Sequence, residues 1–174
     1  MESWIVSKCP TDEGDYILKN ASRTLIRFSE RCQPDIGQLM AEMEELNVPF
    51  AYADKVKEIY FTLMPDHGDH KDGYIRISFT NQSREILGRI LIHELAHNVD
   101  DEEGLSERED IIEEKRKKAR YLPDTYARKN VDEYIAIGFE TYYCGTPEQK
   151  RKMKRCNPRL FGAIRYLHRK YKAR

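Results

Sequence analysis

The amino-acid sequence predicts an α+β domain in which a small mixed sheet packs on one central helix. Short runs rich in β-branched and aromatic residues lie before residue 80, and such runs are typical of strands. Beyond residue 80, apolar side chains recur at intervals of three and four, which is typical of amphipathic helices. We therefore expect a single domain over residues 1–174, with a sheet-containing part, 1–80, and a mostly helical part, 81–174.

Local patterns place the elements of the first part. The strand candidates are residues 24–28, 48–52, 56–64 and 74–79. Between the first two, apolar residues at helical spacing predict an amphipathic helix over 35–46, with Asp35 as its N-cap. Residues 1–22 carry weak signals, and we expect an irregular lead-in there.

The segment 65–73 is rich in Pro, Gly, Asp and His, and we expect a loop. Its histidines, His67 and His70, offer with three aspartates the ligands of a second metal site, but we favour a solvated turn because no rigid element fixes them. The strand 74–79 alternates apolar and polar residues. We expect it at the edge of the sheet, where a peptide substrate can add as a further strand.

Composition argues against several classes of protein. The 30 basic residues balance 30 acidic ones, so the net charge indicates no polyanionic partner such as nucleic acid. No run of 18 apolar residues occurs, so we expect no membrane span. No signal peptide is visible, and the chain reads as cytoplasmic. The four cysteines form no CxxC pair, which favours reduced thiols over disulfides.

The motif H-E-x-x-H, from His93 to His97, is the strongest chemical signal in the chain. Histidines four apart share one face of a helix, and imidazole is a common zinc ligand. Glu94 is placed to act as general base on a metal-activated water. We expect this helix to begin near residues 81–83, to end by Gly104, and to be largely buried. Burying these polar groups is costly unless a metal partners them.

The third metal ligand is not decided by spacing alone. Catalytic zinc usually has three protein ligands and a water. Glu103 is one candidate if the helix breaks at Asp100. A helix expected around 131–140 offers two more, Glu133 and Glu140.

Three features together resemble a known family. The His93–His97 motif is followed by Asp100, three residues after the second His, and Tyr126 stands seven residues before Glu133. This pattern is similar to the catalytic domain of anthrax toxin lethal factor and its relatives, including the Pro-Pro endopeptidases. The resemblance covers residues 73 to 168, including an Asn157-Pro158 turn between two helices.

The resemblance implies a zincin-like metallopeptidase fold with one Zn²⁺ per chain. It implies His93, His97 and Glu133 as zinc ligands, Glu94 as general base, and Tyr126 as the donor to the developing oxyanion. We expect Asp100 to orient a ligand histidine. One position departs from the family pattern: Ile137 stands where members often carry a second Glu. The loops that would select a substrate are not recognisably shared, and members are often exported or delivered as toxins.

The C-terminal segment from Lys150 to Arg174 carries eleven basic residues and no acid. We favour a packed helix, capped by Asn157, whose charges offset the helix dipole and the acidic stretch 100–114. The alternative is a surface for nucleic acid or an anionic protein. The sequence therefore predicts a zinc metalloendopeptidase acting on a protein or peptide, with a catalytically inactive zinc-containing binding module as the alternative. Nothing in the sequence indicates an oligomeric state.

Overall fold

A computed structural model describes residues 4, 6–8, 16–19, 23–29, 34–63, 68–78 and 83–173. The fold is α+β, as predicted, with a mixed sheet and six α-helices among these residues. The chain divides into two compact parts, Met1–Asn98 and Val99–Arg174. The boundary falls inside helix α2 (Arg84–Glu103).

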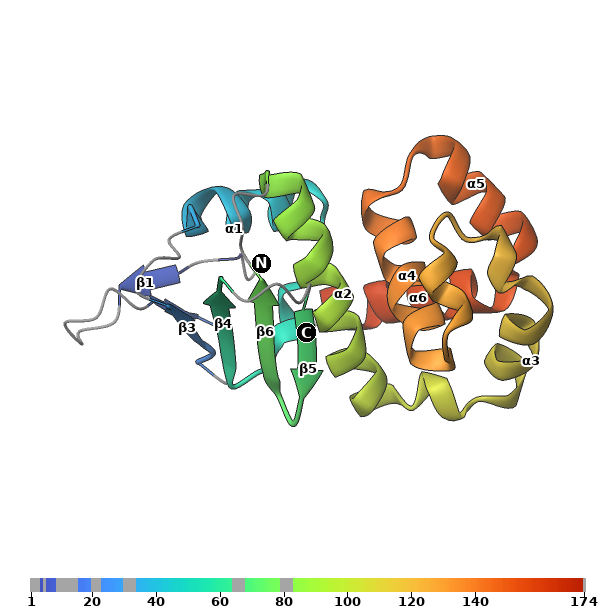
Figure 1. Cartoon of the computed structure of the whole chain (residues 1–174), viewed down its shortest axis with the longest axis horizontal. Coiled ribbons are helices and arrows are strands. Elements are labelled where there is room, and N and C mark those ends of the chain that lie inside the picture. The colour runs from blue at the N-terminus through green and yellow to red at the C-terminus, as the bar shows by residue number, and fades with distance from the viewer. Residues whose placement is uncertain are drawn as a thin grey trace. The chain divides into compact units, whose positions relative to one another are not determined.

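The first part contains a six-stranded sheet in the order β1-β2-β3-β4-β6-β5 (Figure 1). The strands are β1 (Val6–Lys8), β2 (Tyr16–Leu18), β3 (Leu25–Phe28), β4 (Glu58–Thr62), β5 (Gly68–Lys71) and β6 (Tyr74–Ser78). The pairs β3/β4 and β4/β6 are parallel, and the remaining neighbours are antiparallel. The predicted strands within 24–28 and 56–64 are confirmed.

A row of isoleucines forms the centre of the sheet. Ile26 lies opposite Ile59, which lies opposite Ile75, and each side chain is almost completely buried. Helix α1 (Ile36–Glu45) connects β3 to β4, and such a crossover is what two parallel strands require. The Asp35 carboxylate accepts the backbone N–H of Gln38 at 2.9 Å, so the predicted N-cap is confirmed.

The predicted loop over 65–73 is wrong in its second half, because β5 and β6 form a hairpin (Figure 1). Asp72 and Gly73 connect the two strands, and both have positive φ angles, 53° and 81°. That pair of angles is typical of the two-residue type I′ turn. The hairpin also overturns the expected edge position of 74–79: β6 pairs on both sides, and β5 is the end strand. Residue 79 and residues 64–67 lie outside the described part of the chain.

Two other expectations for the first part are wrong. Residues 48–52 form no strand: Phe50–Ala53 is a short 3₁₀ helix whose four residues are all buried. Within 1–22, the expected irregular lead-in contains β1 and β2, which form an antiparallel pair. Both strands are only three residues long, so the β-propensity of their residues gives a weak signal in the sequence.

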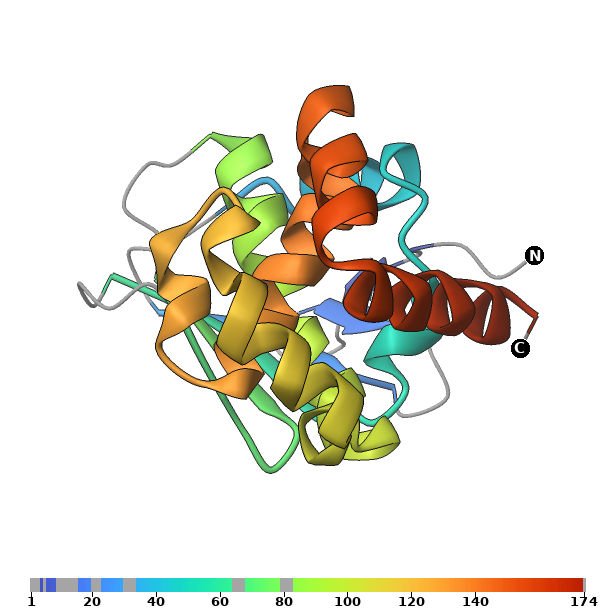
Figure 2. The same cartoon turned by 90° about the vertical axis from the view of Figure 1, so that its right-hand side faces the viewer.

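The second part is helical, as predicted. Its helices are α3 (Glu109–Lys118), α4 (Val131–Cys144), α5 (Pro147–Cys156) and α6 (Pro158–Lys172). Figure 2 shows α6 along most of its length, in dark red. A Cβ added to Gly138 of α4 would lie 2.5 Å from a Leu160 side-chain carbon, so the missing side chain lets α4 and α6 pack closely.

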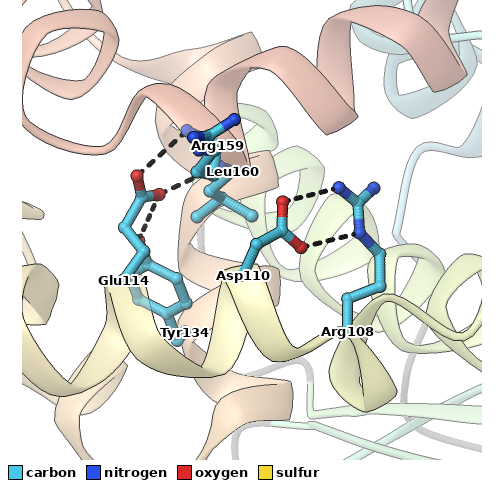
Figure 3. A network of polar contacts seen from close by, with 6 residues as sticks. All are labelled: Arg108, Asp110, Glu114, Tyr134, Arg159 and Leu160. Carbon is cyan, nitrogen blue, oxygen red and sulfur yellow. Dashed lines mark hydrogen bonds and ion pairs between the residues drawn. The ribbon is translucent and has the colours of Figure 1, made fainter.

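The N-terminus of α6 is capped from another helix. Pro158 has no N–H, and the next two N–H groups, of Arg159 and Leu160, donate to the Glu114 carboxylate of α3 at 2.9 and 3.0 Å (Figure 3). Asn157 occupies the predicted cap position, but its side chain makes no capping hydrogen bond. Its amide instead donates to the Tyr134 hydroxyl at 2.9 Å.

The remaining expectations for the fold concern membrane spans and disulfides. Among the described residues, none of the helices is long and apolar enough to cross a membrane. Cys144 and Cys156 form no disulfide with any described residue, and Cys9 and Cys32 lie outside the described residues.

Candidate metal centre

Helix α2 carries the two histidines of the H-E-x-x-H motif. His93 and His97 are one helical turn apart, their ring centroids are 4.9 Å apart, and the rings are inclined by 72°. Both side chains are half-buried, whereas their neighbours Ile92 and Ala96 are buried. The predicted apolar side of this helix is confirmed at Leu87, Leu91 and Val99 but not at Ile86, which is 46% exposed.

A buried amide fixes α2 just after the second histidine. The Asn98 side chain donates to the backbone carbonyl of Tyr52 at 3.0 Å, which attaches α2 to the 3₁₀ helix at residues 50–53. No role was predicted for Asn98 from the sequence. The available signal was a polar residue between His97 and Val99 on a helix that was expected to be largely buried.

Glu133 lies in the first turn of α4. The Asn130 side chain caps this helix by accepting the backbone N–H of Glu133 at 2.8 Å. The cap fixes the turn from which the carboxylate projects, and a negative charge at a helix N-terminus is favourable. The Glu133 side chain is only 12% exposed, and the Lys129 ammonium lies 3.5 Å from its Oε1.

The predicted ligands form one potential metal-binding group: one atom from each of His93, His97 and Glu133 lies within 4.8 Å of the other two. Two imidazole nitrogens and one carboxylate oxygen are a donor set that suits zinc and leaves a fourth position open. These residues can therefore hold a metal ion, and the donor chemistry fits the zinc that the sequence predicts. Glu140 does not belong to this group.

The alternative ligand Glu103 has other partners. Helix α2 continues past Asp100 without a break and ends at Glu103, before Gly104, whose φ is 62°. The Glu103 carboxylate accepts hydrogen bonds from the Lys170 ammonium at 2.6 Å and from the Tyr171 hydroxyl at 2.8 Å. The helix break that a Glu103 ligand requires is therefore absent from α2.

Helix α2 carries two buried acids close to the histidines in sequence. Glu94, the predicted general base, is 4% exposed on α2. Asp100 is also buried, and its Oδ1 accepts the backbone N–H of Ser106 at 2.8 Å. Burial raises the pKa of Asp100 above its ordinary value of 3.8, against the weaker lowering effect of Ser106. The hydrogen bond from Ser106 to Asp100 thus supports the turn after α2. The expected role of Asp100 in orienting a ligand histidine stays a prediction.

Tyr126 stands in a short 3₁₀ helix, Thr125–Arg128, that packs on α4. The Asp124 carboxylate caps this helix by accepting the N–H of Tyr126 at 2.8 Å. The ring is 46% exposed, and the Lys129 ammonium donates to its hydroxyl at 2.6 Å. This hydrogen bond raises the pKa of Lys129, so the lysine stays charged.

A third histidine lies beside the motif. His70 stands on β5, and its ring is nearly parallel to that of His97, with centroids 6.5 Å apart. His70 is not part of the potential metal-binding group. His67 and Asp66, two candidate ligands of the second metal site considered for 65–73, lie outside the described residues.

Comparison with known proteins adds no assignment. No family model matches the chain, and a search of curated proteins gives no significant match. The resemblance to the lethal-factor family therefore stays a prediction from the motifs.

Proposed function

We propose that this protein is a zinc-dependent metalloendopeptidase with a zincin-like fold. The observation that carries the proposal is the group of His93, His97 and Glu133, with Glu94 directly after the first histidine. Two histidines, one carboxylate and an adjacent general base are a set of side chains that can support metal-dependent peptide hydrolysis.

The metal, Glu94 and Tyr126 each have a defined task in this reaction. A bound zinc ion would polarise the scissile carbonyl and make a water acidic enough to attack near neutral pH. Glu94 takes the proton of the attacking water and returns it to the leaving amine. Tyr126 donates its phenol hydrogen to the oxygen on which negative charge develops.

The end strand β5 gives the proposed binding site for the substrate backbone. It replaces the predicted strand 74–79, because β6 has partners on both sides. An extended peptide can pair with the free edge of an end strand through main-chain hydrogen bonds. β5 carries His70, whose ring lies beside that of His97, so a peptide along β5 would run close to this part of α2.

Cleavage profiling against a diverse peptide library tests the proposal. Zinc-loaded wild-type protein should cut a defined subset of peptides. Glu94→Ala should bind zinc as well as the wild type does and should cut none, because the ligands remain and the base is lost. Full activity in Glu94→Ala would overturn the mechanism, and failure of the zinc-loaded wild type to cut any peptide would overturn the function.

The exposed face of α6 supports a second candidate function, a binding module for an anionic partner. Tyr166 is 65% exposed and is flanked by the exposed side chains of Arg165 and Arg169. Basic residues interleaved with an exposed aromatic ring are typical of surfaces that bind single-stranded nucleic acid. This alternative does not need Glu94.

A salt titration separates the two functions. If α5 and α6 bind nucleic acid, neutralising exposed basic residues of both helices should abolish a salt-sensitive mobility shift of RNA or DNA. The residues to replace are Arg165 and Arg169 of α6 and Arg151, Lys152, Lys154 and Arg155 of α5. Lys150 is left intact, because its ammonium donates to the backbone carbonyl of Tyr143 at 2.9 Å and supports the turn before α5. Absence of a shift with wild-type protein at low salt would remove this candidate.

A further inference from the structure

Lys129 contacts both Tyr126 and Glu133, the two residues of the second part that the proposed reaction uses. Its Nζ lies 2.6 Å from the Tyr126 hydroxyl oxygen and 3.5 Å from Oε1 of Glu133. The same ammonium lies 4.6 Å from the centroid of the Tyr126 ring. No role was predicted for Lys129 from the sequence.

The backbone around Lys129 is fixed by two caps. Lys129 ends the 3₁₀ helix that Asp124 begins, and its N–H donates to the carbonyl of Tyr126 at 3.0 Å. The next residue, Asn130, caps α4 through the N–H of Glu133. The lysine therefore lies where two capped helices meet, three residues after the tyrosine and four before the glutamate.

The direction of the Lys129 hydrogen bond has a chemical consequence. An ammonium group has three donors and no acceptor, so the phenol oxygen of Tyr126 accepts this bond. The phenol hydrogen then cannot point at Lys129 and remains available to another acceptor. A cation at the phenol oxygen also makes the O–H group a stronger donor.

We propose that Lys129 is a positioning residue that holds Tyr126 as a hydrogen-bond donor for the reaction. The inference rests on the proposed function, because it assigns the acceptor as the developing oxyanion of the substrate. The Glu133 carboxylate lies 3.5 Å from the same ammonium, so one lysine contacts both the Tyr126 phenol and the carboxylate of a proposed metal ligand.

This role differs from that of an ordinary surface ion pair. Lys129 is 56% exposed although Glu133 is only 12% exposed, so solvent still screens the ammonium and the pair contributes little to stability. Lys117 and Glu113 on α3 form such a pair at 2.6 Å and serve as a matched control. Replacing either lysine should leave the melting temperature unchanged, and only the Lys129 variant should affect the reaction.

A double-mutant cycle in the zinc-loaded protein tests the link to Tyr126. Lys129→Met should lower kcat about tenfold, with KM and zinc content unchanged, as expected for a weakened oxyanion donor. Lys129→Arg should restore most of the loss, and Lys117→Met should have no effect. In a Tyr126→Phe background, Lys129→Met should cause no further loss. An equal loss in both backgrounds, or none in either, would overturn the inference.

A second measurement does not depend on activity. In protein carrying Glu94→Gln, the ¹³Cζ NMR resonance of Tyr126 should shift with Lys129→Met and stay in place with Lys117→Met. If the resonance does not shift while the zinc-loaded wild type cleaves peptides, the inference is overturned and the proposed function stays intact. If the resonance shifts but the zinc-loaded wild type cleaves no peptide, the proposed function is overturned, and with it the catalytic role of the contact between Lys129 and Tyr126.

Discussion

The Glu114 carboxylate accepts the backbone N–H of Leu160 at 3.0 Å, across 46 residues of sequence. The same carboxylate accepts the N–H of Arg159 and the hydroxyl of Tyr134 (Figure 3). Glu114 is buried, and its partners belong to α4 and α6. One acid thus connects three helices of the second part.

Replacement of Glu114 should therefore destabilise the protein strongly. Glu114→Ala leaves two N–H groups and a buried hydroxyl without an acceptor, and each such group costs about 1–3 kcal/mol. We expect a loss of about 3 kcal/mol or more in the free energy of unfolding, measured by urea denaturation. The control Glu113→Ala, one residue earlier and exposed, should leave the denaturation midpoint unchanged. Equal midpoints for the two variants would contradict the capping role.

Removal of the Tyr126 hydroxyl should slow the proposed reaction without unfolding the protein. Loss of one oxyanion donor lowers kcat by about 10²–10³-fold in comparable enzymes. Tyr126→Phe should show this loss in steady-state cleavage with KM unchanged, because the phenol would act in the transition state. The control Tyr166→Phe changes an exposed tyrosine of α6 and should leave kcat as it is. A Tyr126→Phe variant with wild-type kcat would remove Tyr126 from the mechanism.

The stability contribution of Asp100 should depend on pH with a defined sign. Because its pKa is raised in the folded state, the ionised carboxylate destabilises the fold relative to the protonated one. Asp100→Asn imitates the protonated form and keeps an acceptor for Ser106. The variant should match the wild type below pH 3.8, the ordinary pKa, and become the more stable as pH rises through the folded-state pKa.

Urea denaturation of the metal-free protein at low and neutral pH measures this difference. Asp110 provides a control of opposite sign, because its hydrogen bond with Arg108 lowers the pKa of that carboxyl. Asp110→Asn should lower stability at neutral pH, and the loss should vanish as pH falls through the folded-state pKa. An Asp100→Asn protein that is less stable than the wild type at pH 7 would contradict the sign derived for Asp100.

The larger features of the fold were predictable because their local sequence patterns were strong. Helix α1 with its Asp35 cap follows from apolar spacing and capping chemistry, and the two central strands follow from runs of β-branched and aromatic residues. The predicted strand 48–52 was wrong because the apolar and aromatic character of residues 50–52 reflects burial in a 3₁₀ helix. The hairpin at Asp72-Gly73 carried a usable signal, since Asp-Gly before alternating residues favours a type I′ turn.

The site was predictable in its residues but not in its contacts. Spacing could not separate Glu133 from Glu140, although Asn130, three residues before Glu133, was a usable sign that α4 begins there. The Glu114 cap of α6 joins positions 46 residues apart, and local patterns carry no information at that separation. Lys129 stands at helical spacing from Glu133, but its bond to Tyr126 depends on the 3₁₀ helix before it.

The central claim is that His93, His97 and Glu133 bind one zinc ion. Zinc content and affinity, measured after dialysis for the wild type and for Glu133→Ala, test it most directly, with Asp132→Ala as an exposed control from the same turn. The account predicts about one zinc per chain for the wild type and the control, by the three-ligand rule. For Glu133→Ala it predicts an affinity at least about 100-fold lower, since loss of a ligand should exceed the effect of a supporting residue. Zinc bound by Glu133→Ala at wild-type affinity would contradict it.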